Sequence, residues 1–200
     1  MPPEPAPADR QDRRKVRTRA ALLAAAQQLV REGRDASASI QTITDLADVG
    51  FGSFYNHFES KEELFAAAVS AAMDDYLAWL DNHVPDSDDP VMRLYESVRL
   101  TGRLATELPE TAAVLSRRFA LVEESADSLG TRMRADVRAA MTASNPQFDD
   151  HELGTLLVAA SGAMQAVLSS AQSLTAEQTA VAGDVLANAM LRLLSIEPPA

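Results

Sequence analysis

Cysteine is absent from the chain, which excludes a disulfide framework and a thiolate metal site. Aromatic residues are scarce, at 5% of the 200 positions, and the eight glycines form no phosphate-binding loop after a strand. No stretch shows the alternation of a half-buried strand, whereas 46% of the residues are hydrophobic and many recur at helical spacing. These features predict an all-α protein that is long enough to bury a substantial core.

The first ten residues, MPPEPAPADR, lack the basic and then apolar order of a secretory signal. Proline and alanine dominate this segment, so we expect residues 1–9 to form a disordered tail. Together with the lack of cysteine, this start fits a cytoplasmic protein.

Groups of residues with the spacing of an enzyme active site are also lacking. His57, His83 and His151 fall in separate segments, and no carboxylate pair has a spacing that implies a shared proton. The run 81–89 contains His83 and four aspartates, but no regular spacing would hold them as metal ligands, so a solvated acidic loop is favoured. We therefore expect no catalytic residue, no metal and no cofactor. A small helical enzyme, or a ligand-binding protein without a DNA role, is the alternative.

A net charge of −11 argues at first against a nucleic-acid partner. Between Arg10 and Arg34, however, eight basic residues face only two acidic ones. Such a run alone is equally explained by a solvated tail or a targeting peptide. Placed directly before a helix-turn-helix, it predicts an arm that contacts phosphates or the minor groove, through Arg13, Arg14, Lys15 and Arg17.

The stretch 40–61, IQTITDLADVGFGSFYNHFESK, predicts a helix-turn-helix followed by the start of a longer helix. Its apolar residues have the spacing of two short crossed helices joined by a turn, and they are Ile43, Ala47, Val49, Phe54 and Phe58. The other face of the second helix carries short polar or flat groups, which suit the floor of a major groove and its flanking phosphates: Phe51, Gly52, Ser53, Tyr55, Asn56 and His57.

At these residues the sequence resembles the TetR-type (TetR/AcrR) family of transcriptional repressors. The resemblance covers roughly residues 17–69, and its matching positions are Ile43, Ala47, Val49, Gly52, Ser53, Phe54, Tyr55, His57, Phe58, Ser60, Lys61 and Glu62. Two positions depart from the family pattern. Asp48 replaces the usual glycine at a left-handed turn position, which aspartate tolerates, and Thr44 replaces the usual alanine where the helices cross.

The resemblance implies a homodimeric, ligand-responsive regulator that is released from a palindromic operator by a small-molecule inducer. It implies that Tyr55, His57 and Lys61 chiefly contact phosphates, although packing would also explain Tyr55 and an ordinary surface position would explain His57. The expected DNA-binding residues are Arg13, Arg14, Lys15, Arg17, Ser39, Thr42, Gly50, Phe51, Gly52, Ser53, Tyr55, Asn56, His57 and Lys61.

Hydrophobic periodicity and capping signals predict about nine helices and no sheet. The predicted ranges are 17–32, 40–47, 52–58, 60–82, 90–107, 109–118, 120–143, 149–171 and 175–194. Helix-capping residues are expected at Ser39, Ser60, Asp89, Asp149 and Thr175. We expect a DNA-binding domain over residues 10–61, and a ligand-binding and dimerisation domain over residues 62–200.

The segment 153–176 contains no charged residue, which raises the alternative of a membrane span. Its many Gly, Ser, Thr and Gln residues argue against a span and favour a helix packed both on its own core and on a second subunit. The expected dimer contacts are Leu153, Leu157, Gly162, Ala166, Val185, Ala189 and Leu193. No membrane partner is expected.

The larger domain offers aromatic, methionine and arginine residues that suit an apolar ligand bearing an acid group. The expected ligand-binding residues are Tyr76, Trp79, Tyr95, Arg99, Arg103, Met133 and Met164. Arg99 and Arg103 also have the spacing of surface ion pairs with Glu96 and Glu107, and this reading is favoured.

Overall fold

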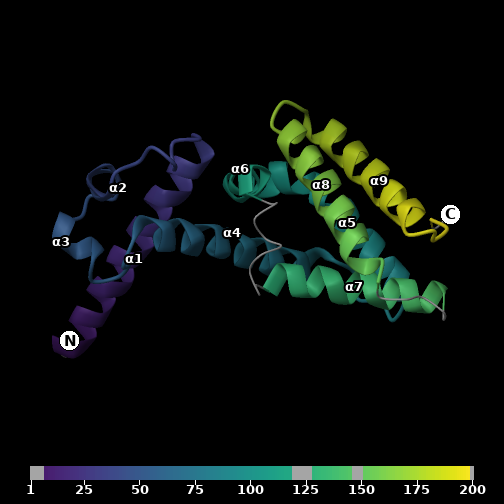
Figure 1. Cartoon of the computed structure of the whole chain (residues 1–200), viewed down its shortest axis with the longest axis horizontal. Helices are drawn as coiled ribbons and strands as arrows, with labels where there is room; N and C mark the ends of the chain where they lie inside the picture. The colour runs from purple at the N-terminus through teal and green to yellow at the C-terminus, as the bar shows by residue number, and fades with distance from the viewer. Residues whose placement is uncertain (1–6, 119–127, 146–150, 199–200) are drawn as a thin grey trace, which may run out of the picture. The chain divides into compact units, whose positions relative to one another are not determined.

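The computed structural model describes residues 7–118, 128–145 and 151–198. Within those residues the chain forms nine helices and no strand, which confirms the predicted all-α class (Figure 1). The helices are α1 (Pro7–Arg31), α2 (Ile40–Leu46), α3 (Phe51–Phe54), α4 (Lys61–His83), α5 (Pro90–Glu107), α6 (Pro109–Arg118), α7 (Ser128–Ser144), α8 (Leu153–Ala171) and α9 (Ala176–Leu193).

The chain divides into two compact units, Met1–Ser70 and Ala71–Ala200, and the division falls within α4. We call them the amino-terminal and the carboxy-terminal unit. The functional division expected after Lys61 stays a prediction.

The amino-terminal unit is held by one small apolar core. Leu22, Ala26 and Leu29 recur at helical spacing along α1 and are completely buried. Side chains from α2, from α3 and the segment after it, and from the start of α4 close the other side of this core, namely Ile43, Phe54, Phe58, Leu64 and Ala68. A hydrogen bond of 3.1 Å from Gln27 Nε2 to the carbonyl oxygen of Ala68 also joins α1 to α4. The helix-turn-helix is therefore mounted on α1 and on the start of α4.

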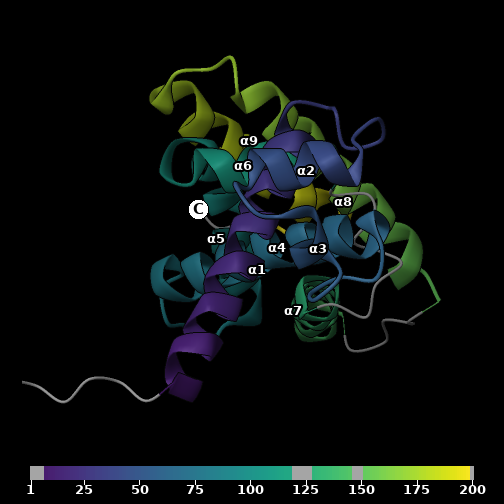
Figure 2. The same ribbon diagram turned by 90° about the vertical axis from the view of Figure 1, so that its left-hand side faces the viewer.

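Helix α1 begins at Pro7, so the predicted start at residue 17 was wrong, and so was the disordered tail for residues 7–9. Arginine, lysine, glutamine and alanine are strong helix formers, and proline is tolerated in a first helical turn. The amino-terminal turns of α1 extend beyond α2 and α3 (Figures 1 and 2), and residues 11–17 are exposed.

Helix α3, in contrast, is shorter than predicted: it covers only Phe51–Phe54 instead of residues 52–58. The chain after it still turns in a helical sense, since the amide of Phe58 donates to the carbonyl of Phe54 at 3.1 Å. Residues 55–57 therefore form a turn that continues the course of the helix.

Most of the predicted caps are confirmed. Ser39, Asp89 and Thr175 each accept a hydrogen bond from a backbone amide of the helix that they precede. Ser60 accepts from the amide of Glu63 at 3.1 Å, whereas the carboxylate of Glu63 accepts from the amide of Glu59. The expected cap at Asp149 and residues 120–127 of the expected seventh helix lie outside the described residues.

The closest helix contact in the carboxy-terminal unit is between α5 and α9. A Cβ built on Gly102 would lie 2.6 Å from the Cα of Gly183, and a Cβ on Gly183 would collide with the carbonyl oxygen of Arg99. Because no side chain separates the two backbones, only glycine fits at this crossing. Around it, α6 packs on α8, α7 lies against α5, and α8 runs beside α9.

We expect Gly102→Ala to lower the free energy of unfolding by about 1–3 kcal/mol or more, because the added methyl group must push two backbones apart. Thermal unfolding would report this as a lower Tm. Gly154→Ala is the matched control, since a Cβ there meets nothing within 4 Å and alanine is the better helix former. A Gly102→Ala protein with the wild-type Tm would contradict the close crossing.

Candidate functional site

Within the segment from Gly50 to Phe58, one set of side chains is buried and another set is exposed. Phe54 and Phe58 are 0% and 3% exposed, whereas Phe51 and Tyr55 are 47% and 55% exposed. The ring of Tyr55 lies edge-on to those of Phe51 and Phe54, with centroids 5.8 and 5.3 Å apart. The phenol group thus stands on the surface of a ring cluster that fixes its direction.

Between these aromatic residues lie the polar members of the predicted recognition face. Gly52 and Asn56 are exposed, and Ser53 and His57 are half-buried. With Phe51 and Tyr55 they form one surface, which we call the recognition face. It offers hydroxyl, amide and imidazole groups but no acidic side chain, so it suits the edges of bases and the oxygens of phosphates.

Helix α2 and the turn after it accommodate both departures from the family pattern. Asp48 has φ 53°, so aspartate adopts the left-handed conformation that was expected at this position. Thr44 is completely buried, and its hydroxyl donates to the carbonyl of Gln41 at 3.0 Å. The larger polar residue is therefore satisfied within its own helix. At the start of α2, the hydroxyls of Ser39 and Thr42 lie 2.8 Å apart.

The basic residues Arg13, Arg14, Lys15 and Arg17 are all exposed and lie on α1. An α-helix with its side chains is about 10–12 Å wide, and the minor groove of B-DNA is about 6 Å wide. Of the two contacts expected for these residues, their position on a helix favours phosphates along the edge of a groove over the minor groove, and both contacts stay predictions. Two residues after Arg17, the guanidinium of Arg19 lies over the ring of Phe58, 5.3 Å from its centroid.

Lys61 has a structural contact that the sequence did not reveal. Its ammonium group donates to the carbonyl oxygens of Ala38 and Ala36 at 3.1 and 3.3 Å, and so joins the start of α4 to the loop before α2. A Lys61→Ala change would therefore affect stability as well as any phosphate contact.

The sequence model of the family described as "Bacterial regulatory proteins, tetR family" matches residues 21–68, which hold the core of the amino-terminal unit and the recognition face. The chain is a TetR-family transcriptional regulator. The DNA-binding domain that the sequence predicts over residues 10–61 and the role of each residue on the recognition face stay predictions.

Solved structures resemble the whole TetR-family chain. RolR (NCGL1110) in complex with resorcinol is 25% identical over 92% of this chain and 91% of that chain, with a TM-score of 0.57. A TetR-like regulator from Rhodococcus sp. RHA1 is 19% identical over 89% and 96%, with a TM-score of 0.64. A putative tetR family regulator from Shewanella sp. PV-4 is 15% identical over 88% and 95%, also at 0.64. No curated protein sequence matches the chain.

A cavity of about 30 Å³ lies in the carboxy-terminal unit of this regulator. That volume holds about one or two water molecules. Its lining residues come from α4, α5, α7, α8 and α9 and are mainly apolar: Tyr76, Leu80, Leu94, Ser97, Val98, Arg132, Met133, Asp136, Val137, Ala160, Met164 and Met190. A larger ligand would have to displace side chains.

Of the residues expected to bind a ligand, the structure brings Tyr76, Met133 and Met164 together around the cavity. Trp79 lies behind them, stacked on Tyr76 with the ring centroids 6.4 Å apart. Tyr95, Arg99 and Arg103 do not line the cavity.

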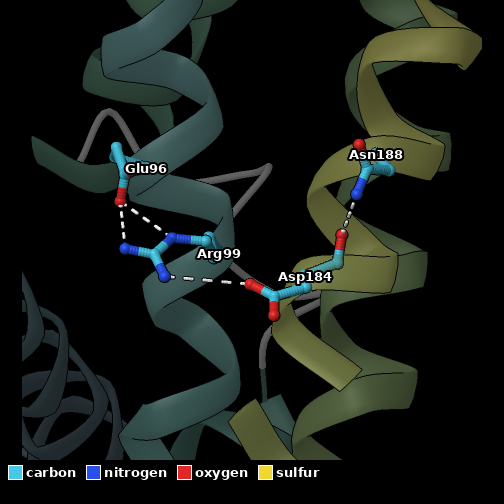
Figure 3. A network of polar contacts seen from close by, with 4 residues as sticks. All are labelled: Glu96, Arg99, Asp184 and Asn188. Atoms are coloured by element: carbon cyan, nitrogen blue, oxygen red, sulfur yellow. Dashed lines mark hydrogen bonds and ion pairs between the residues drawn. The ribbon is translucent and has the colours of Figure 1, made fainter. Parts of the chain in front are cut away.

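Neither of the two arginines expected to bind an acid group, Arg99 and Arg103, lines the cavity. Arg99 donates to Glu96 at 2.6 Å and lies 3.8 Å from Asp184 of α9, as Figure 3 shows. The hydrogen bond that Arg99 donates to Glu96 is the main reason why the pKa of Arg99 is raised. Arg103 is exposed. The ion pair is therefore confirmed for Arg99, and an acid-binding role has no geometric basis at either residue.

Sequence reasoning missed the charged residues that do line the cavity, Arg132 and Asp136. Arg132 Nη1 pairs with Asp81 of α4, and its Nε lies 3.7 Å from a carboxylate oxygen of Asp136, one turn along α7. Burial raises the pKa of Asp136, against the opposing effect of Arg132 and Arg93. The sequence did contain a signal for these two residues. Arg132 and Asp136 have the i, i+4 spacing of an ion pair, and each directly precedes an apolar residue of α7, Met133 or Val137.

The predicted dimer residues divide between the inside and the outside of the subunit. Leu153 and Leu157 are buried in its own core, 1% and 8% exposed, so their assignment to a dimer contact is corrected. Gly162, Ala166, Val185, Ala189 and Leu193 are exposed. Val158 and Val181, 57% and 56% exposed, lie on α8 and α9 as well and were missed.

By length and composition alone, α8 is the one described helix that could cross a membrane, with a mean hydropathy of 1.4. Its stripe of Leu153, Leu157, Met164 and Leu168 is packed inside the carboxy-terminal unit. Its apolar character is explained by that core and by the exposed small residues. Among the described residues, no group of His, Asp or Glu is arranged to hold a metal ion.

The buried phenol of Tyr76 makes stability depend on pH at the alkaline end. Its hydroxyl lies 2.8 Å from that of Thr101, and burial raises its pKa from 10.0 to about 12. Between those values the unfolded chain releases this proton and the folded chain keeps it, so stability is complete below pH 10 and falls as pH rises.

We expect this residue to account for about 2–3 kcal/mol of the loss of unfolding free energy over that window. Urea unfolding of wild type and Tyr76→Phe at several alkaline pH values would measure it, because phenylalanine cannot titrate. Identical pH profiles for the two proteins would show that the phenol is not protected in this way.

Proposed function

We propose that this TetR-family regulator is a homodimeric repressor, active in the cytoplasm, that binds an inverted repeat of DNA and is released by a small molecule. The observation that carries the proposal is the recognition face, whose polar groups are exposed while Phe54 and Phe58 anchor the same segment in the core. No specific feature favours an enzyme, or a ligand-binding protein without a DNA role.

The charge distribution supports DNA binding despite the net charge of −11. The exposed basic residues of α1 and the uncharged recognition face belong to one compact unit, so phosphates meet a locally positive surface. Two copies related by a two-fold axis would present two recognition segments, which demands half-sites about 34–36 Å apart or a longer multiple of the helical turn.

We expect operator affinity to fall with salt, with a slope of about −0.9 per neutralised phosphate. Tyr55→Phe keeps the ring contacts with Phe51 and Phe54 but removes the hydroxyl, so it should weaken binding about five- to tenfold without changing stability. Fluorescence anisotropy with a labelled duplex selected by the protein would measure both effects.

Asn56→Ala should also weaken binding, and Asn82→Ala is its matched control, because Asn82 is an exposed asparagine of α4 in the carboxy-terminal unit. Unchanged affinity in both Tyr55→Phe and Asn56→Ala would remove the proposed recognition face.

The exposed side of α8 and α9 supports a second copy of the chain as the partner. Val158, Val181, Val185 and Leu193 are large apolar residues with 46–62% of their surface exposed. Gly162 and Ala166 lie exposed on α8, where small residues allow two helices to approach closely. A two-fold axis through this face would bury it in a four-helix arrangement.

Gly162→Leu tests this contact, because a Cβ there meets nothing within 4 Å in the subunit itself. The subunit should tolerate the leucine, so we expect circular dichroism of a folded protein but sedimentation of a monomer or an aggregate, and loss of operator binding. Ala78→Leu adds the same side chain at an exposed position of α4 and should leave the dimer intact. A normal dimer carrying Gly162→Leu would place the contact elsewhere.

Ligand control is supported by the cavity and by the course of α4. This helix begins at Lys61 beside the helix-turn-helix and carries Tyr76 and Leu80, which line the cavity. RolR, similar over nine tenths of the chain, was solved with resorcinol, which supports a small-molecule ligand here. Coupling between two sites is typically about 1–3 kcal/mol, so a ligand would lower operator affinity about 5- to 150-fold.

A further inference from the structure

The charged groups beside the cavity are already engaged with one another. Arg132 lies between Asp81 and Asp136, and Arg93 donates to the carbonyl of Ser87 at 2.8 Å. These two arginines and two aspartates carry charges that cancel. A carboxylate ligand would have to displace Asp81 or Asp136 from Arg132 and leave that aspartate without its partner, which is costly in a half-buried site.

Asp136 differs from the other three because its carboxylate has hydrogen-bonding capacity to spare. Its Oδ2 lies 3.7 Å from Nε of Arg132, which is longer than a hydrogen bond. Within residues 7–118, 128–145 and 151–198, this carboxylate has no shorter ion pair. Its side chain is 26% exposed and lines the cavity. A ligand hydroxyl can therefore donate to Asp136 without breaking any existing pair.

The rest of the wall is mainly apolar, with Ser97 and Tyr76 as its polar exceptions, and it is adaptable. Met133, Met164 and Met190 line the cavity from three different helices. Methionine has an unbranched side chain that readily changes rotamer, so these three residues can move apart around a molecule larger than the present volume.

We propose that this cavity binds neutral apolar molecules that carry a hydroxyl donor, that Asp136 accepts the hydrogen bond, and that carboxylates are rejected. The assignment deepens the proposed ligand control by naming the chemical class of the ligand. It does not require that the ligand act on DNA.

Trp79 provides a readout that is independent of DNA. It is the single tryptophan of the chain, it is 8% exposed, and it stacks on Tyr76 of the cavity wall. A ligand that moves Tyr76 changes the surroundings of the indole ring, so binding can be followed by intrinsic fluorescence and confirmed by calorimetry.

The test compares three probes that share a methyl-substituted benzene ring and differ in the para group: toluene, para-cresol and para-toluate. We expect para-cresol to bind wild-type protein about tenfold or more tightly than toluene, because a hydrogen bond to an ionised group strengthens binding. Para-toluate should bind more weakly than toluene. Equal affinity for para-cresol and toluene, tighter binding of para-toluate, or no binding by any probe up to its solubility would each overturn the proposal.

The variant Asp136→Asn tests whether Asp136 causes the preference for para-cresol over toluene. It should reduce the ratio of para-cresol to toluene affinity about tenfold and improve para-toluate binding, because Arg132 loses a competing carboxylate. Asp184→Asn is the matched control, an exposed aspartate paired with Arg99 away from the cavity, and should keep the wild-type ranking. An unchanged ratio of para-cresol to toluene affinity in Asp136→Asn would exclude Asp136 as the acceptor.

Measuring operator affinity with each probe separates this inference from the proposed function. Para-cresol that binds through Asp136 but leaves DNA affinity unchanged would refute the ligand control and keep the ligand class. Release of the operator by para-toluate alone would keep the control and refute the class.

Discussion

The recognition face, where we propose that DNA binds, depends on the burial of Phe54 and Phe58. A helix of four residues such as α3 cannot persist in water by its own hydrogen bonds. These two rings fix it, because they insert into the core that α1, α2 and α4 build. The polar residues between them are thereby held on the outside, so one interaction supplies both the stability of the segment and the direction of its side chains.

The carboxy-terminal unit follows a comparable logic around the crossing of α5 and α9. Gly102 and Gly183 let the two backbones touch, which commits one side of α9 to the interior. The opposite side of α9 carries Val181 and Val185 into solvent beside the exposed small residues of α8. Tight packing inside the unit and an unpartnered apolar face outside it are therefore two results of the same helix orientation.

Local charge governs both proposed binding sites more than the net charge does. Although the chain is acidic overall, basic groups are concentrated on α1, where we propose that phosphates bind. Electrostatic attraction decays within about 10 Å at moderate salt, so a phosphate there responds to these nearby charges more than to the net charge. At the cavity, Arg132 is held between two aspartates, so a group that looks like an anion receptor by type is not one by environment. The binding behaviour of a half-buried charged group depends on its partners. Because Arg132 is already paired with Asp81 and Asp136, it does not act as a free cation.

Sequence alone determined the helix-turn-helix, the family, the left-handed turn at Asp48 and most helix caps, since these depend on residues a few positions apart. It did not locate the start of α1, because good helix formers allowed two starts and no local stop separated them. Periodicity showed that α8 has two apolar faces, but only packing decided that Leu157 points inward and Val158 outward. Likewise, the i, i+4 spacing of Arg132 and Asp136 was visible in the sequence, but only the meeting of α4 and α7 decided that Arg132, and not Arg99, borders the cavity. The pairing of Arg132 with Asp81, 51 residues away, leaves no local pattern.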